Sequence, residues 1–330
     1  MFGRRIELAR KRSGLSLRTL SEALGGSPSH RAIREIEKEE ATPDGAILKR
    51  LSEILDVSLE FLMGGWVSRL EGVEFRKSAS NSTQDRARVE IEVIDLLDRY
   101  LSVEVVLELD AAGWNPPIPL ERPTEEAEAE AIAGRLRDAW NLGDDPIPDL
   151  TELLEERGLK VLAISLPNSV SGLTCWAVRP RNRGRLPVIV VNRDHGLERR
   201  RFTLAHELAH RVMDAGSLVK PESAANRFAG AFLVPASHLR RHVSSARHPS
   251  RRQLSYGEVI RLKRYYRVSA AAILVRSRPD WRVAGRGDST SVSGHCANLA
   301  QMRASADRDR RRRANRGASP FRTSLPLGSG

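Results

Sequence analysis

The chain is poor in cysteine, in aromatic residues and in long apolar runs. Its 330 residues include two cysteines, too few for a disulfide framework or a cysteine-ligated zinc knuckle. The longest apolar run, VSAAAILV, is far shorter than the roughly 18 residues that a membrane-spanning helix needs. A secretory signal has an apolar segment directly after its basic N-terminus, and this chain lacks such a segment. These shortages exclude a disulfide-stabilised secreted domain and a membrane protein, so we expect a cytoplasmic protein without a membrane partner.

Positive charge is abundant but unevenly distributed. The formal net charge is +12 and the pI is about 10.4. Residues 277–330 contain eleven arginines and four aspartates, whereas residues 1–65 contain eleven Lys or Arg and ten Asp or Glu. The global charge therefore reflects mainly the end of the chain, which is rich in Arg, Ser and Gly and poor in apolar residues. We expect residues 279–330 to form a disordered tail.

Residues 1–65 have the apolar spacing of five short helices, with glycines and capping residues between them. A tight turn between the second and third helices is typical of a helix-turn-helix domain. The blocks RIELARKRSGLSLRTLSEALG, IREIE and LKRLSEILDVSLEFLMG resemble the Cro/C1-type (XRE) helix-turn-helix family. The resemblance implies that the helix at 29–37 enters the major groove of a double-stranded DNA operator and that the protein dimerises. Its exposed candidates for base or phosphate contact are Ser29, His30, Arg31 and Arg34.

The remainder has helical and strand-like segments in a mixed order. Residues 66–123 are expected to be a helical connector that ends in a proline-rich linker. Residues 124–278 begin with two helices, and then KVLAISL, GLTCWAV and PVIVVN have the composition of strands. We expect these strands to form a small antiparallel meander, followed by helices that include two between residues 254 and 278. The predicted fold class is α+β and mostly helical, with a small antiparallel sheet packed on helices.

The segment FTLAHELAHRVMDAG carries the candidate chemistry. Apolar residues from Arg200 to Asp214 have helical spacing, so His206 and His210, four residues apart, lie on one face of a helix. Two imidazoles in this arrangement bind Zn²⁺, and Glu207 beside them is placed to take a proton from a metal-bound water. Mn²⁺ is the alternative metal. The competing interpretation is an amphipathic helix that carries two surface histidines without a metal.

A catalytic zinc site needs a third protein ligand. Asp214 lies eight residues after His206, about 12 Å along a helix, which is too far for both to reach one ion. Glu222 lies near the start of a second predicted helix, PESAANRFAGAFLVP, from which it can reach the metal. Asn226 is one turn further on and can orient a histidine ring. The alternative role for Glu222 is a carboxylate stabilised by the helix dipole.

Several blocks resemble the ImmA/IrrE family of metallopeptidases. They are DAWNLGDDPIPDLTELLEERGLKV, PVIVVN, RRRFTLAHELAHRVMD and ANRFAGAFLVP. The resemblance implies a zincin-like fold in which His206, His210 and Glu222 hold the metal and Glu207 is the catalytic base. Some members of the family have an acidic residue two positions later, where this chain has Ala224.

The expected function combines the two domains. The resemblance implies a DNA-binding regulator fused to a zinc-dependent, gluzincin-like metallo-endopeptidase that cleaves a protein, for which a transcriptional regulator is the expected class. The alternative is a non-catalytic repressor or antitoxin in which the metal domain is a sensor or a vestige. Glu207 favours the enzyme, because a purely structural metal site needs no base.

Overall fold

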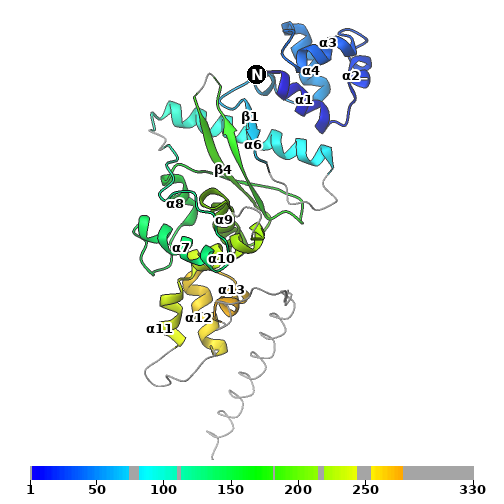
Figure 1. Cartoon of the computed structure of the whole chain (residues 1–330). Helices are drawn as coiled ribbons and strands as arrows, with labels where there is room; N and C mark the ends of the chain where they lie inside the picture. Colours follow the sequence, from blue (N-terminus) through cyan, green and yellow to red (C-terminus); the bar gives the residue numbers. More distant parts are fainter. Residues whose placement is uncertain are drawn as a thin grey trace, which may run out of the picture. The chain divides into compact units, whose positions relative to one another are not determined.

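The computed structural model describes residues 2–73, 82–109, 113–180, 183–214, 219–243 and 254–277. The chain divides into two compact units, residues 1–233 and residues 234–330 (Figure 1). The expected tail, residues 279–330, lies outside the described residues. Among the helices that are described, none combines the length and the apolar character needed to cross a bilayer. The α+β fold class, mostly helical, is confirmed.

The N-terminal part contains the five predicted helices. They are α1 (Phe2–Arg12), α2 (Leu17–Ala23), α3 (His30–Glu37), α4 (Gly45–Leu55) and α5 (Leu59–Met63). A polar side chain caps the N-terminus of each helix from α2 to α5 by accepting a backbone N–H three residues later; the caps are Ser16, Ser29, Asp44 and Ser58. Fully buried aliphatic side chains, among them Ile6, Leu20, Ile33 and Leu55, form their shared core.

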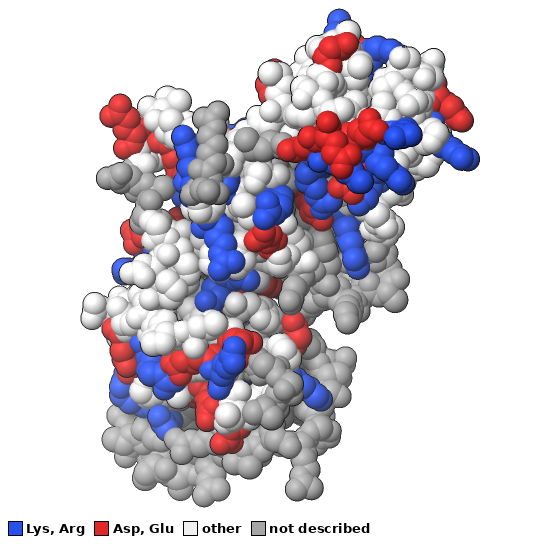
Figure 2. All heavy atoms as spheres, turned by 45° about the horizontal axis from the view of Figure 1, so that its top comes forward, with Lys and Arg blue, Asp and Glu red and all other residues white. Residues whose placement is uncertain are grey.

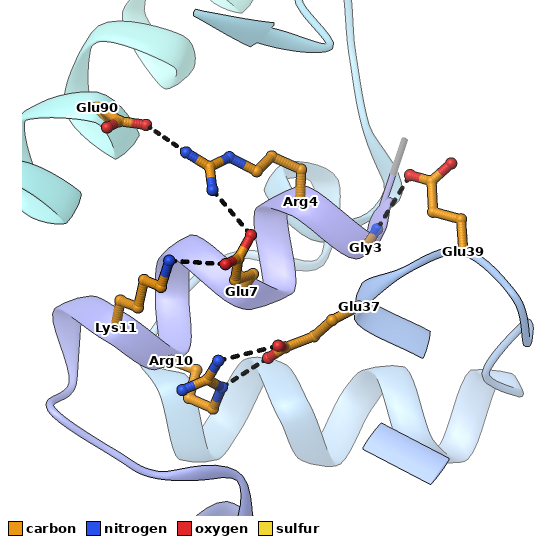
Figure 3. Close-up of polar contacts among 8 residues, drawn as sticks. All are labelled: Gly3, Arg4, Glu7, Arg10, Lys11, Glu37, Glu39 and Glu90. Carbon is orange, nitrogen blue, oxygen red and sulfur yellow. Dashed lines mark hydrogen bonds and ion pairs between the residues drawn. The ribbon is translucent and has the colours of Figure 1, made fainter. Parts of the chain in front are cut away.

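Ion pairs attach α1 to its neighbours (Figure 3). The guanidinium of Arg10 makes a bidentate pair with Glu37 at the end of α3, with Nε–Oε1 and Nη2–Oε2 distances of 2.6 and 2.9 Å. These hydrogen bonds raise the pKa of Arg10. Arg4 bridges Glu7 on its own helix and Glu90 on another helix, at 2.8 and 3.1 Å. Ion pairs to two other helices therefore hold α1 in place, in addition to the packing of its apolar face.

The connector contains the long helix α6 (Thr83–Val106), which begins with a capping box formed by Ser82 and Asp85. Asp98 on α6 holds the end of the helix-turn-helix part. Its carboxylate accepts hydrogen bonds from the fully buried guanidinium of Arg5 (2.7 Å) and from the backbone N–H of Val67 (3.0 Å). Arg5 also donates to the carbonyls of Phe61 and Val67, so the buried charge is paired and hydrogen-bonded.

The sheet has four strands in the order β1-β3-β4-β2. They are β1 (Arg69–Glu71), β2 (Lys160–Ile164), β3 (Gly172–Val178) and β4 (Arg185–Asn192). The predicted antiparallel meander is wrong, because β2 pairs in parallel with β4 and not with β3. The physical reason is the burial of β4: all its residues from Leu186 to Asn192 are buried, as in a central strand covered on both faces. Strand β1 was not predicted.

Helices cover both faces of this sheet (Figure 1). Val188 and Val190 of β4 join the core that includes α6, and the alternate residues of the strand face α9 (Leu197–Val212). Helix α10 (Pro221–Leu233) packs against both α9 and α7 (Glu128–Ala139), while α8 (Leu150–Glu156) precedes β2. These contacts hold α9 between the sheet and α10.

The second unit contains three described helices: α11 (Ala236–Val243), α12 (Tyr256–Tyr266) and α13 (Ala270–Arg276). The two helices predicted between residues 254 and 278 are α12 and α13, and Ser269 caps the second of them. Helix α11 was not predicted. The buried hydroxyl of Tyr266 and Nδ1 of His238 on α11 form a 2.5 Å hydrogen bond that joins α11 to α12.

Candidate metal centre

Helix α9 carries His206, Glu207 and His210, and its other face is buried. Its aliphatic residues pack into the core, and they include Leu204, Ala205, Leu208, Ala209 and Val212. The helix ends at Val212, and the chain is extended at Met213, which pairs with Glu121. Because one side of α9 is fixed against the sheet, its polar residues at 206, 207 and 210 have defined directions.

The two histidines of α9 face a common point. Nε2 of His206 lies 3.3 Å from Nε2 of His210, and the ring centroids are 5.1 Å apart. His206 is buried, with 3% of its surface exposed, whereas the side chain of His210 is 24% exposed. The pair is therefore buried on one side and reachable from solvent on the other.

Helix α10 brings a carboxylate to the same point. Glu222, in its first turn, lies with Oε2 3.5 Å from Nε2 of His206 and with Oε1 3.9 Å from Nε2 of His210. The position of α10 is secured at its far end by the buried Arg137 of α7, which donates a 2.6 Å hydrogen bond to the carbonyl of Phe232. The structure thus brings together the three ligands predicted from the sequence, within 4.8 Å of one another.

Asn226 sets the orientation of one imidazole. Nδ1 of His206 donates a 3.0 Å hydrogen bond to Oδ1 of Asn226, one turn after Glu222 on α10. A neutral histidine that carries its proton on Nδ1 presents the Nε2 lone pair. That nitrogen is the one directed toward His210 and Glu222, so the hydrogen bond to Asn226 is compatible with a metal ligand role for Nε2 of His206.

Glu207 lies on the face of α9 that is directed at the sheet. The residue is 5% exposed. Gly172, the first residue of β3, allows this close packing: a Cβ at that position would lie 2.5 Å from Cγ2 of Thr203, 2.7 Å from the carbonyl oxygen of Val190 and 3.5 Å from Cγ of Glu207. A residue with a side chain at position 172 would push α9, and Glu207 with it, away from β3.

The donor set and its spacing fit a tetrahedral zinc ion. Ligand atoms about 2.0–2.2 Å from a tetrahedral Zn²⁺ are separated from one another by roughly 3.4 Å. Here the two Nε2 atoms are 3.3 Å apart, Oε2 of Glu222 lies 3.5 Å from Nε2 of His206, and Oε1 of Glu222 lies 3.9 Å from Nε2 of His210. Two imidazoles and one carboxylate are also the protein ligands of many hydrolytic zinc sites, which leave the fourth position for water.

Two other positions do not contribute to the cluster. The carboxylate of Asp214 accepts a hydrogen bond from Arg122 at 3.0 Å and lies outside the group of metal-ligating atoms. Ala224, two residues after Glu222, is completely buried among apolar neighbours of α10. Glu222 is thus the acidic residue of α10 that reaches the histidines.

Two supporting residues were missed by the sequence reasoning: Gly172 and Asn192. The amide of Asn192, fully buried at the end of β4, donates to the carbonyls of Leu166 and Val170 and accepts from the N–H of Asp194. It thereby fixes the loop that leads into β3 and the turn before α9. An asparagine at the end of an apolar strand was the available signal, because a buried amide needs several partners.

The four DNA-contact candidates lie on or next to α3. Ser29, His30, Arg31 and Arg34 are all exposed. The hydroxyl of Ser29 accepts the N–H of Ala32, so it also caps the helix. Arg31 forms a pair with Glu35 at 3.3 Å, and most of its side chain is exposed to solvent.

Two segments of the chain match the models of known protein families. Residues 154–278 match the family model of the IrrE N-terminal-like domain of the M78 peptidases, and residues 6–62 match that of the helix-turn-helix family. The chain carries both domains. The IrrE N-terminal-like domain contains α9, α10 and the whole histidine–glutamate cluster, and the helix-turn-helix domain contains α3. The resemblances to the ImmA/IrrE and XRE families are confirmed. None of the curated proteins compared matches the chain.

Proposed function

We propose that this protein is a zinc-dependent metallo-endopeptidase that also binds DNA and that it cleaves a regulatory protein. The observation that carries the proposal is the convergence of His206, His210 and Glu222 from two helices at separations suited to one tetrahedral ion. The imidazoles favour Zn²⁺ over Mn²⁺, because nitrogen ligands suit zinc and oxygen ligands suit manganese.

Each residue of the cluster has a separate role in this proposal. His206, His210 and Glu222 hold the metal, and Asn226 keeps His206 in the tautomer that binds it. When bound, Zn²⁺ lowers the pKa of water to about 7 and polarises a carbonyl group. Glu207 accepts the proton of the attacking water and delivers it to the departing amine nitrogen of the cleaved peptide bond.

The helix-turn-helix domain supplies the second half of the function. A match to this family indicates DNA binding, and α3 presents its polar residues to solvent. We propose that α3 enters the major groove of an operator, with Arg31 and Arg34 contacting bases or phosphates. We further propose that the protein binds DNA as a homodimer, because proteins of this architecture contact two half-sites related by two-fold symmetry.

Cleavage of a cellular protein tests the enzymatic proposal. Glu207→Gln removes the base but keeps a side chain of the same size, so the metal should remain bound while proteolysis is lost. The measurement is a comparison of new protein N-termini in cells that express the wild type or the variant. We expect at least one regulatory protein to be cut only by the wild type, with a rate loss of about 10²–10⁴-fold in the variant.

The matched control is Glu156→Gln, which removes an exposed carboxylate from α8, outside the cluster. It should cleave as the wild type does. If the wild type, the Glu207 variant and this control give identical sets of N-termini while the wild type still binds DNA, the protein is a non-catalytic regulator whose metal domain is a sensor or a vestige.

A further inference from the structure

The hairpin that joins β3 to β4 is strongly basic. Its described residues include Arg179, Arg183 and Arg185, and the turn is closed by a 2.9 Å hydrogen bond from the N–H of Arg179 to the carbonyl of Gly184. Arg183 and Arg185 are exposed, and Arg179 is half-buried. Within the described part of the chain, none of the three forms an ion pair with a carboxylate. Elsewhere the charges are mixed: Figure 2 shows basic and acidic side chains interspersed over much of the visible surface.

The two exposed arginines of the hairpin each stack on a tryptophan ring. The guanidinium carbon of Arg185 lies 4.2 Å from the ring centroid of Trp176, and that of Arg183 lies 5.5 Å from the ring centroid of Trp66. Stacking of this kind fixes the plane of a guanidinium but leaves its N–H groups available. The side chains are therefore ordered before any ligand arrives, which lowers the entropic cost of binding an anion.

The hairpin is attached to the end of the helix-turn-helix part. The N–H and the hydroxyl of Ser68 both donate to the carbonyl of Val178, at 2.8 and 2.9 Å, and β1 then pairs with the last three residues of β3. Trp66, which stacks on Arg183, directly precedes this connection. The opposite end of β3, at Gly172, packs beside Glu207, and six residue steps along the strand separate the two ends by about 20 Å.

We propose that this hairpin, through Arg183 and Arg185, is a second contact of the protein with the phosphate backbone of double-stranded DNA. Planar guanidinium groups bind phosphate oxygens in a bidentate manner. The link to the end of the helix-turn-helix part, and the distance from the metal centre along β3, favour DNA over a protein substrate as the ligand. The hairpin adds affinity that does not depend on base sequence, since phosphate contacts position a protein without reading bases.

The test measures how salt weakens binding to a 40-base-pair duplex of mixed sequence. Each phosphate neutralised by an arginine contributes about 0.9 to the slope of log Kobs against log salt concentration. The double variant Arg183→Ala with Arg185→Ala should therefore have a slope smaller by about 1.8 than that of the full-length wild type. Replacement of both residues by lysine should restore most of the slope, because the charge is retained.

The matched control is Arg157→Ala with Arg122→Ala. Arg157 is also exposed and stacked on a tryptophan, Trp140, at 5.7 Å, and the double control removes the same net charge. It should leave the slope unchanged. A separate double variant, Arg31→Ala with Arg34→Ala, reports on α3 alone, so that failure of the hairpin and failure of the helix-turn-helix to bind DNA can be distinguished.

Three results would overturn the proposal. The first is a hairpin alanine variant whose slope and affinity equal those of the control double. The second is a lysine variant that loses as much slope as the alanine variant, which would indicate a structural effect of the stacking. The third is a larger loss on a single-stranded 40-mer than on the duplex, which would assign the hairpin to single strands.

Discussion

At the scale of single residues, the spacing of polar groups along helices determined the candidate metal centre. His206 and His210 were predictable because residues four apart share a helix face. Glu222 and Asn226 have the same spacing on the next helix, and the structure places both beside the histidines. The role of Gly172 was not predictable, because it depends on the distance between β3 and α9, which no local pattern in the sequence encodes.

That close approach gives a prediction for Gly172→Ala. The added methyl group would lie 2.5 Å from Thr203 and 2.7 Å from the backbone of Val190, so α9 must shift. Overpacking of this kind costs about 1–3 kcal/mol of the free energy of unfolding. Denaturant unfolding measures this loss, and the displaced α9 should also reduce the retained metal.

Gly134→Ala is the matched control for this substitution. Gly134 lies within α7, and a Cβ there would meet nothing within 4 Å. Alanine in a helix interior is favoured over glycine by roughly 0.5–1 kcal/mol, so this variant should be slightly more stable than the wild type. If the two alanine variants have equal stability, the packing of β3 against α9 is looser than the structure indicates.

At the scale of elements, the sequence predicted which segments form strands and helices, but it did not predict how the strands pair in the sheet. Segments such as GLTCWAV and PVIVVN have the composition of strands, and both are strands. The parallel pairing of β2 with β4 was missed because pairing depends on contacts between distant segments. The three-residue β1 is too short to show an alternating pattern, and its place beside β3 comes from the anchoring of Val67 and Ser68.

The ion pairs of Glu7 within α1 make the stability of this helix depend on pH. Burial raises the pKa of the Glu7 carboxyl, but hydrogen bonds from Lys11 and Arg4 outweigh it, so the pKa lies below its ordinary value of 4.5. Since the folded-state pKa is lower than the unfolded one, the stabilisation is complete above about pH 4.5. It is lost as the pH falls through the folded-state pKa.

Glu7→Gln should therefore destabilise the protein at pH 7 and have less effect at pH 3.5. The expected difference at pH 7 is about 0.5–1 kcal/mol, the range for partly exposed ion pairs. Denaturant unfolding of both proteins at the two pH values provides the measurement. The control is Glu53→Gln, an exposed residue of α4. A Glu7 effect that is as large at pH 3.5 as at pH 7 would contradict the electrostatic explanation.

At the scale of the whole molecule, a DNA-binding domain and a peptidase-like domain occur in one chain. Residues 6–62 and 154–278 match the two families, and α6 and β1 lie between them in the sequence. Asp98 of α6 holds the end of the helix-turn-helix part, and β1 continues from there into the sheet that supports α9. The elements between the two matched segments are thus part of the structural support of both.

The measurement that tests the central claim most directly is the metal content of the purified full-length protein. We predict one zinc ion per chain in the wild type and in Glu207→Gln, because Glu207 is not a ligand. Glu222→Ala should lose most of its zinc, whereas Glu156→Ala, which removes an exposed carboxylate of α8, should retain it. Elemental analysis after dialysis against a weak chelator gives the stoichiometry. Equal zinc content in the wild type and in Glu222→Ala would contradict the assignment of a single site shared by α9 and α10.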